Sequence, residues 1–302
     1  MEVSSIDSGM RERRAIQFGL ISVLLWSSVA TGFKLGLSVL SITQLLWLGT
    51  LISWILFSLA IIITGRWRLS KDDYALAAIL GLINPCLYYL ILFSAYDRLP
   101  AYIAQPLNYT WAITLALLSI PILRQSLSLQ AFAGILISYA GVVLLLATSQ
   151  ELADGRLDAL GIALALVSTL LWATYWLLNT RARSGPLALM FWSFSAALPV
   201  LTLIMHLTDG PPAWHAEQLL YGAWVGLLEM GVTFLTWQQA LRLTQNTARI
   251  GQLIFLSPFL SLVLIYFILN EPIGPGALVA LIIIVTGLIV TQRSATPTAR
   301  LR

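Results

Sequence analysis

The sequence predicts an all-α integral membrane protein whose ten transmembrane helices form two inverted five-helix repeats around a central cavity. The first of three observations behind this fold class is composition: of 302 residues, 59% are hydrophobic and 10% are charged. Soluble domains carry about 25% charged residues, so the main solvent of this chain is lipid. The second is that the apolar residues form ten continuous runs, and the third is that the last five runs repeat features of the first five.

Length and pattern predict that each run is a membrane-spanning helix. A helical span takes about 20 apolar residues, and none of the runs shows the period-two alternation of a barrel strand. The predicted spans are 15–35, 43–64, 74–96, 99–120, 128–148, 158–180, 186–207, 217–241, 246–269 and 275–292. The domains are then a first repeat at 1–148, a connecting loop at 149–157, a second repeat at 158–292 and a cytoplasmic tail at 293–302.

Polar residues and turn signals mark the ends of these spans in chain order. Residues 28–30 read Ser-Val-Ala and resemble a signal-peptidase site, but the first run continues to Leu40 and nine spans follow, which predicts an uncleaved first helix. Asp97 and Arg98 form a tight turn between the third and fourth spans, where we expect them to pair. The polar stretch 149–158 separates the two halves, and Gly-Pro-Pro at 210–212 separates the seventh and eighth spans.

The internal repeat is visible at a constant offset. The Leu-Leu-Trp that ends at Trp26 recurs at Trp172, 146 positions later, and the same offset places Gly141 opposite Gly287. These glycines predict close packing of the fifth and tenth spans. With five spans in each half, the second copy must enter the membrane from the opposite side. Inverted repeats are typical of secondary transporters, in which substrate binds between the repeats near the middle of the membrane.

The distribution of basic residues predicts the orientation. With the N-terminus placed in the cytoplasm, thirteen Lys and Arg residues fall in cytoplasmic segments and three fall on the other side, as the positive-inside rule requires. We therefore expect a multi-pass protein of the cell inner membrane with both termini in the cytoplasm. Lys34 and Arg249 lie near the ends of spans, and we expect their charged groups to reach the membrane surface.

Glu229 is the most informative ionisable residue within a predicted span. It lies about 12 residues, or roughly 18 Å, into the eighth span. A charged carboxylate at that depth costs about 2.5–3.5 kcal/mol, so it should face the protein interior or water. Asn84 occupies the equivalent depth in the third span, and Pro85 beside it predicts a kink. Glu229 is interpreted as the partner of a substrate amino group or of a coupling proton; the alternative is a hydrogen bond between helices.

Aromatic and amide side chains at helical spacing complete the candidate site. Asn108 and Trp111 share one helix face, which suits a substrate with a polar end and an apolar end, although an amide also bridges membrane helices. Trp26 and Trp172 lie deeper than the interfacial belt, which favours cavity lining. The predicted substrate-binding residues are Trp26, Asn84, Tyr88, Asn108, Trp111, Trp172, Tyr175, Glu229, Trp237 and Gln252.

Several of these features resemble the EamA-type drug/metabolite transporter superfamily. The resemblance covers almost the whole chain and rests on the early tryptophan of each repeat, on Pro258, and on the Asn-Glu-Pro at 270–272. The first repeat departs from the pattern, with Ala112 in place of proline and Gln125 in place of glutamate. The resemblance implies a cavity bounded by helices 1, 3, 4, 6, 8 and 9, with helices 5 and 10 at the periphery. Glu271 is then expected to be structural.

Within the superfamily, the Leu-Asn-Tyr-Thr-Trp at 107–111 and the eleven tryptophans look most similar to the YddG-like aromatic amino-acid exporters. The resemblance implies an exporter of small amphipathic metabolites, with aromatic amino acids as the first candidates, that works by alternating access. A drug or other metabolite efflux carrier is the alternative within the same fold. A monomer would suffice, because the two repeats together make a complete transport unit.

Other function classes find little support in the sequence. One cysteine and two histidines disfavour a disulfide, a metal site and a metalloenzyme, and the sequence shows no nucleophilic triad. The net charge of +4 is spread along short loops, which gives no surface for nucleic acid. An intramembrane enzyme or a membrane scaffold is therefore disfavoured. We expect no cofactor, and as partners only a small-molecule substrate and the lipid bilayer.

Overall fold

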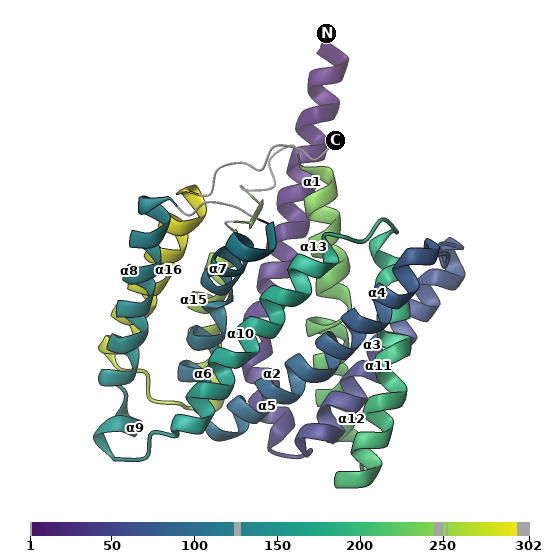
Figure 1. The fold of residues 1–302 in the computed structure, drawn as a ribbon. Helices are drawn as coiled ribbons and strands as arrows, with labels where there is room; N and C mark the ends of the chain where they lie inside the picture. The colour runs from purple at the N-terminus through teal and green to yellow at the C-terminus, as the bar shows by residue number, and fades with distance from the viewer. Residues whose placement is uncertain (1, 124–127, 245–249, 252, 295–302) are drawn as a thin grey trace.

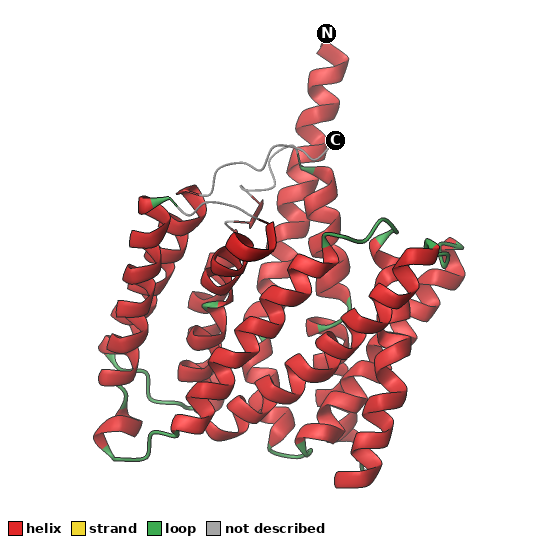
Figure 2. Ribbon diagram, in the orientation of Figure 1, coloured by secondary structure: helices red, strands yellow, loops and turns green. Residues whose placement is uncertain are grey.

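The fold is described from a computed structural model that covers residues 2–123, 128–244, 250–251 and 253–294. These residues form helices and connecting loops, without a strand (Figure 2). The predictions for Arg249 and Gln252, and the position of Gln125, lie outside them. The long helices run roughly alongside one another, and both the start of α1 and the end of α16 lie at the upper end of the molecule in Figure 1.

The first half contains the helices α1 (Glu2–Ser27), α2 (Val29–Leu37), α3 (Ile42–Thr64), α4 (Lys71–Gly81), η1 (Leu82–Leu87), α5 (Tyr88–Arg98), α6 (Ala101–Tyr109), α7 (Trp111–Leu123) and α8 (Leu129–Ala147). A short α9 (Gln150–Ala153) precedes the second half. That half contains α10 (Ala159–Asn179), α11 (Pro186–Thr208), α12 (Ala216–Ala223), η2 (Trp224–Glu229), α13 (Val232–Leu243), η3 (Ile254–Leu256), α15 (Ser257–Leu264), η4 (Ile265–Leu269) and α16 (Pro275–Ser294).

Seven of the described helices are long and apolar enough to cross a membrane. They comprise Met10–Leu37, Ile42–Thr64, Lys71–Arg98, Leu129–Ala147, Ala159–Asn179, Pro186–Thr208 and Ala216–Leu243. Ile254–Leu269 and Pro275–Thr291 are shorter apolar helices. The predicted span at 99–120 is divided into α6 and α7 at Thr110. The chain is therefore a multi-pass membrane protein, and ten spans remain a prediction.

Two long helices are interrupted near the residues that the sequence places at equivalent depth. In η1 two helical segments meet at a kink, where Asn84 leaves the helical region with φ −142° and ψ 115°. This confirms the kink predicted at Pro85. In the second half η2 is π-helical and ends at Glu229, and Gly231 follows with φ −106° and ψ −91°. Such wide turns are common at functional sites, because they redirect side chains out of the regular helical register.

Helices α8 and α16 form a pair at one edge of the molecule (Figure 1). A Cβ atom added at Gly287 would lie 2.5 Å from the carbonyl oxygen of Gly134, and one at Gly141 would lie 2.9 Å from the carbonyl oxygen of Ala280. The two backbones are thus in direct contact, which confirms the close packing predicted from the aligned glycines. The other main contacts join α1 to α13, α3 to α11, and α10 to α5 and α7.

Two charged residues have partners that the sequence did not predict. Arg98 does not pair with its neighbour Asp97; it bonds to Asp158 at 3.1 Å. The Nζ of Lys34 donates to the backbone carbonyls of Tyr96 at 2.8 Å and Leu99 at 3.1 Å, and its place at the membrane surface stays a prediction. These carbonyls end α5 and have no acceptor role within the helix, so a cation there completes their hydrogen bonding.

Candidate functional site

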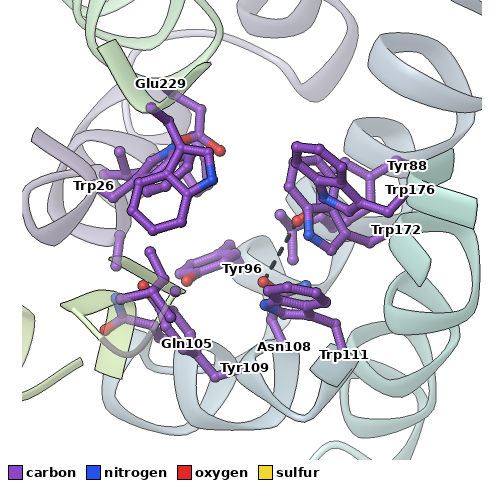
Figure 3. Close-up of a pocket in the computed structure, with 17 residues that line it drawn as sticks. Trp26, Tyr88, Tyr96, Gln105, Asn108, Tyr109, Trp111, Trp172, Trp176 and Glu229 are labelled. Carbon is purple, nitrogen blue, oxygen red and sulfur yellow. Dashed lines mark hydrogen bonds between the residues drawn. The ribbon is translucent and has the colours of Figure 1, made fainter. Parts of the chain in front are cut away.

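A cavity lies between helices of both halves, next to the two interrupted helices. It encloses about 820 Å³ of space free of protein atoms, including the part open to solvent. Its walls come from α1 and α2, α5, α6 and α7, α10, η2 and α13, and η3. These elements lie in the first, third, fourth, sixth, eighth and ninth predicted spans, which are the spans that the family resemblance implies. It is lined by Trp26, Val29, Ala30, Phe33, Tyr88, Leu92, Tyr96, Gln105, Asn108, Tyr109, Trp111, Trp172, Trp176, Glu229, Trp237, Gly251 and Ile254 (Figure 3).

The structure brings seven of the ten predicted site residues to this cavity: Trp26, Tyr88, Asn108, Trp111, Trp172, Glu229 and Trp237. Asn84 and Tyr175 lie outside the lining. Both are buried, with 3% and 5% of their surface exposed, and their side chains interact with each other. They therefore support the wall around the interrupted helix α4–η1–α5. Whether any of these residues contacts a substrate remains a prediction.

Glu229 reaches the cavity because of the local backbone of η2. The carboxylate is 6% exposed, and its Oε1 accepts a hydrogen bond from the Tyr89 hydroxyl at 2.7 Å. Its Oε2 has no hydrogen-bond partner among the described residues. Gly231 permits the turn that follows, since a Cβ there would lie 2.6 Å from the carbonyl oxygen of Gly226. Tyr89 thus holds one oxygen of a buried acid, and the Trp26 side chain also interacts with the carboxylate.

Asn108 is held on the opposite wall by two neighbours. Its Nδ2 donates to the Ser168 hydroxyl on α10 at 2.9 Å, and its Oδ1 accepts from the Tyr88 hydroxyl at 3.4 Å (Figure 3). The amide therefore bridges α6 to α10, as the structural alternative predicts, while it also faces the cavity. The longer of the two bonds is weak, so the amide oxygen can accept a stronger bond from another donor.

Aromatic rings make up most of the cavity wall, with Trp172 at the centre of their contacts. Its ring centroid lies 4.6 Å from that of Tyr88, 5.9 Å from that of Trp176 and 6.4 Å from that of Trp111. Across the cavity, Trp26 stands beside Glu229 (Figure 3) and packs on Trp237 at 5.4 Å. Two aromatic surfaces therefore face each other, with the acid at the edge of one of them.

The described part of the site contains few ionisable groups. Among the described residues no group of three or more His, Cys, Asp and Glu is arranged to hold a metal ion. Glu229 is the one acidic residue in the described lining, which contains no Lys, Arg or His. The arrangement can bind an amphipathic molecule through ring contacts and a few hydrogen bonds.

Comparison with known proteins then assigns the family. The model of the EamA-like transporter family matches the chain twice, at residues 13–147 and 159–293. The chain belongs to the EamA-like transporter family. This EamA-like protein is therefore a membrane transporter of the drug/metabolite type, with two EamA repeats.

The fold of this EamA-like transporter has been solved in another protein. The crystal structure of another protein matches this chain with a TM-score of 0.67 and 22% sequence identity. The match covers 93% of this chain and 97% of the other. At that identity the similarity shows the fold alone. No curated protein matches the chain in sequence.

Five polar or aromatic residues of the cavity were missed from the sequence: Phe33, Tyr96, Gln105, Tyr109 and Trp176. Trp176 follows Trp172 by one helical turn, Gln105 precedes Asn108 by three residues, and both spacings place the pairs on shared faces. That signal was available. Tyr96 lies two turns beyond Tyr88 and close to the predicted end of its span, where position alone does not separate cavity from membrane surface.

Proposed function

We propose that this EamA-like protein is a secondary transporter that exports small amphipathic metabolites by alternating access, with aromatic amino acids as the first candidates. The observation that carries the proposal is one cavity that combines opposed aromatic surfaces with a single buried carboxylate. Aromatic side chains on both walls suit an aromatic ring between them. Glu229 would pair with the amino group at the polar end of the substrate, and Asn108 would form a hydrogen bond to the same end.

The wider architecture in this proposal is ten spans in two inverted repeats, at 1–148 and 158–292, with both termini in the cytoplasm. The cavity lies between the halves, where inverted-repeat transporters bind substrate. Asn84 and Glu229 support the repeat, because each lies at the break of a long helix in its own half. The YddG-like exporters remain the subfamily that the sequence resembles most, and a monomer would contain the whole cavity.

Uptake into proteoliposomes tests the proposed function. Purified protein would be reconstituted, and entry of labelled tryptophan and phenylalanine would be measured with and without an imposed pH gradient, against liposomes without protein. Uptake without a gradient is expected of a facilitative carrier, and uptake only with one is expected of a proton-coupled carrier. No uptake of either amino acid in both conditions would remove aromatic amino acids as substrates.

A further inference from the structure

The polar groups of the cavity match one end of an amino acid and not the other. Glu229 supplies an acidic group at the wall, which is negative when ionised, and the described lining has no Lys, Arg or His that would supply a positive charge. An ammonium group would therefore find a partner of opposite charge. A carboxylate would enter a mostly apolar space that already holds a carboxylate, and like charges in such a space repel strongly.

The free oxygen of Glu229 is a suitable acceptor for an ammonium group. Tyr89 satisfies Oε1, and Oε2 is buried without a partner among the described residues. Leaving a buried acceptor unbonded is unfavourable, so a donor that enters the cavity gains from reaching it. Trp26 lies on the same side as Glu229 (Figure 3) and packs on Trp237, and ring faces attract cations within about 6 Å of the centroid.

The cation closest in sequence to the described lining is already used elsewhere. Lys34 follows the lining residue Phe33. Its Nζ donates to the backbone carbonyls of Tyr96 and Leu99 and so completes the hydrogen bonding at the end of α5. Releasing it to meet a substrate carboxylate would leave these carbonyls without that donor. The Tyr109 hydroxyl is likewise committed, to Ser257 at 2.8 Å. The described lining thus offers a carboxylate neutral donors, such as the unpartnered Trp176 Nε1–H, but no positive charge.

We propose that the site selects for a cationic aromatic amine, and that an amine without a carboxylate binds more tightly than the matching amino acid. This inference rests on the proposed function and makes it more specific: the determinant of affinity is the aromatic ring with its ammonium group. Phenethylamine, phenylalanine and 3-phenylpropionate form a matched set for the test. They share the phenyl ring and differ in carrying the amine alone, both groups, or the carboxylate alone.

Equilibrium binding to the full-length protein in lipid nanodiscs tests the proposal at neutral pH, where the amine is protonated. Labelled phenethylamine and labelled phenylalanine would be measured directly, and 3-phenylpropionate as a competitor of each. We expect phenethylamine to bind at least about tenfold more tightly than phenylalanine, which is a difference of about 1.4 kcal/mol. We expect 3-phenylpropionate to compete with neither.

Two other results would overturn the proposal in distinguishable ways. Equal or tighter binding of phenylalanine would refute the selection for amines and leave the proposed function in place. It would indicate that a donor meets the carboxylate, and Arg249 and the Trp176 Nε1–H are the candidates. If phenylalanine and phenethylamine both fail to bind, the proposed function itself fails and the inference with it.

The variant Glu229→Gln tests whether Glu229 is responsible for the preference for amines. The substitution keeps a side chain of similar shape beside Tyr89 and removes the charge, so the preference for phenethylamine over phenylalanine should fall to less than about twofold. Glu217→Gln removes an exposed carboxylate from the start of the same long helix and should keep the full preference. A preference that survives in Glu229→Gln would contradict the assignment. If that variant does not fold, the comparison of ligands on the natural protein still decides the proposal.

Discussion

Among single residues, Trp172 and Glu229 define the two sides of the cavity. Trp172 touches rings from α5, α7 and α10, so it connects the walls contributed by both halves. Glu229 lines the cavity; Tyr89 fixes one of its oxygens, and the other is buried without a hydrogen-bond partner among the described residues. Trp111 lies at the edge of the aromatic surface around Trp172. Its ring makes a T-shaped contact with Trp172, and its side chain is half-buried. A ring at that edge can stack on a substrate without holding the bundle together.

Trp111→Ala should therefore reduce binding of aromatic substrates far more than binding of aliphatic ones. A lost ring contact is worth about 0.5–1.5 kcal/mol beyond the buried area, or roughly 2- to 13-fold in affinity. The measurement is the Kd of phenylalanine and of leucine for both proteins in nanodiscs. Trp67→Ala, on a loop with 49% exposure, serves as the control. An equal loss for both ligands would mean that Trp111 has a packing role.

At the level of secondary-structure elements, the ends and contact faces of the helices are fixed by specific polar groups. Glu271 accepts from the backbone N–H of Ala101 at 2.9 Å and of Tyr102 at 3.1 Å, and so caps α6. Lys34 completes the end of α5 just before it. A residue from each half thus stabilises the turn between α5 and α6. This agrees with the structural role expected for Glu271.

The α8–α16 contact predicts a large effect of a small substitution. Gly287→Ala would place a methyl group 2.5 Å from the carbonyl oxygen of Gly134 and force the helices apart. Overpacking of this kind costs about 1–3 kcal/mol. The midpoint of thermal unfolding in detergent should fall. Gly274→Ala is the matched control, because no atom lies within 4 Å of its Cβ position. A fall of the same size in both variants would argue against this contact.

The connection between α3 and α11 predicts a pH-dependent contribution to stability. The Thr43 and Ser41 hydroxyls donate to Asp209 Oδ2 at 2.5 Å and 2.8 Å and lower the pKa of this carboxyl. A lowered pKa in the folded state stabilises above the unfolded pKa of about 3.9, and the effect disappears as pH falls through the folded value. Asp209→Asn should slightly lower the unfolding temperature at pH 7. A difference that persists at pH 3 would contradict this linkage.

For the molecule as a whole, the two repeats meet at the cavity, and both interrupted helices contribute to the site. The breaks at η1 and η2 bring irregular helical backbone to the region where the halves face each other. In the proposed alternating-access mechanism, rocking of one half against the other would change access to that region. The paired glycines of α8 and α16 lie away from the cavity, at the edge of the bundle (Figure 1).

The proposed orientation can be tested by labelling single cysteines. Cys86 is buried and is the one cysteine of the chain, so Cys86→Ala supplies a background without thiols. In that background Asp154→Cys, in the loop after α9, should react with a membrane-impermeant maleimide on intact cells. Arg66→Cys, in the loop after α3, should react only after the cells are opened. The reverse pattern would invert the predicted topology.

The sequence by itself determined that the chain lies in a lipid bilayer, that it is all-helical, that it contains an internal repeat, and which residues make up most of the candidate site. Hydropathy, helical spacing and a repeat offset are read along the chain, so Trp26, Glu229 and Trp172 could be found without coordinates. The tertiary structure alone decided which distant groups meet: Lys34 with the end of α5, Arg98 with Asp158, and Tyr89 with Glu229. These pairs depend on how each helix is rotated and where it is broken. Rotation is set by packing between helices far apart in the chain, which a local pattern does not record.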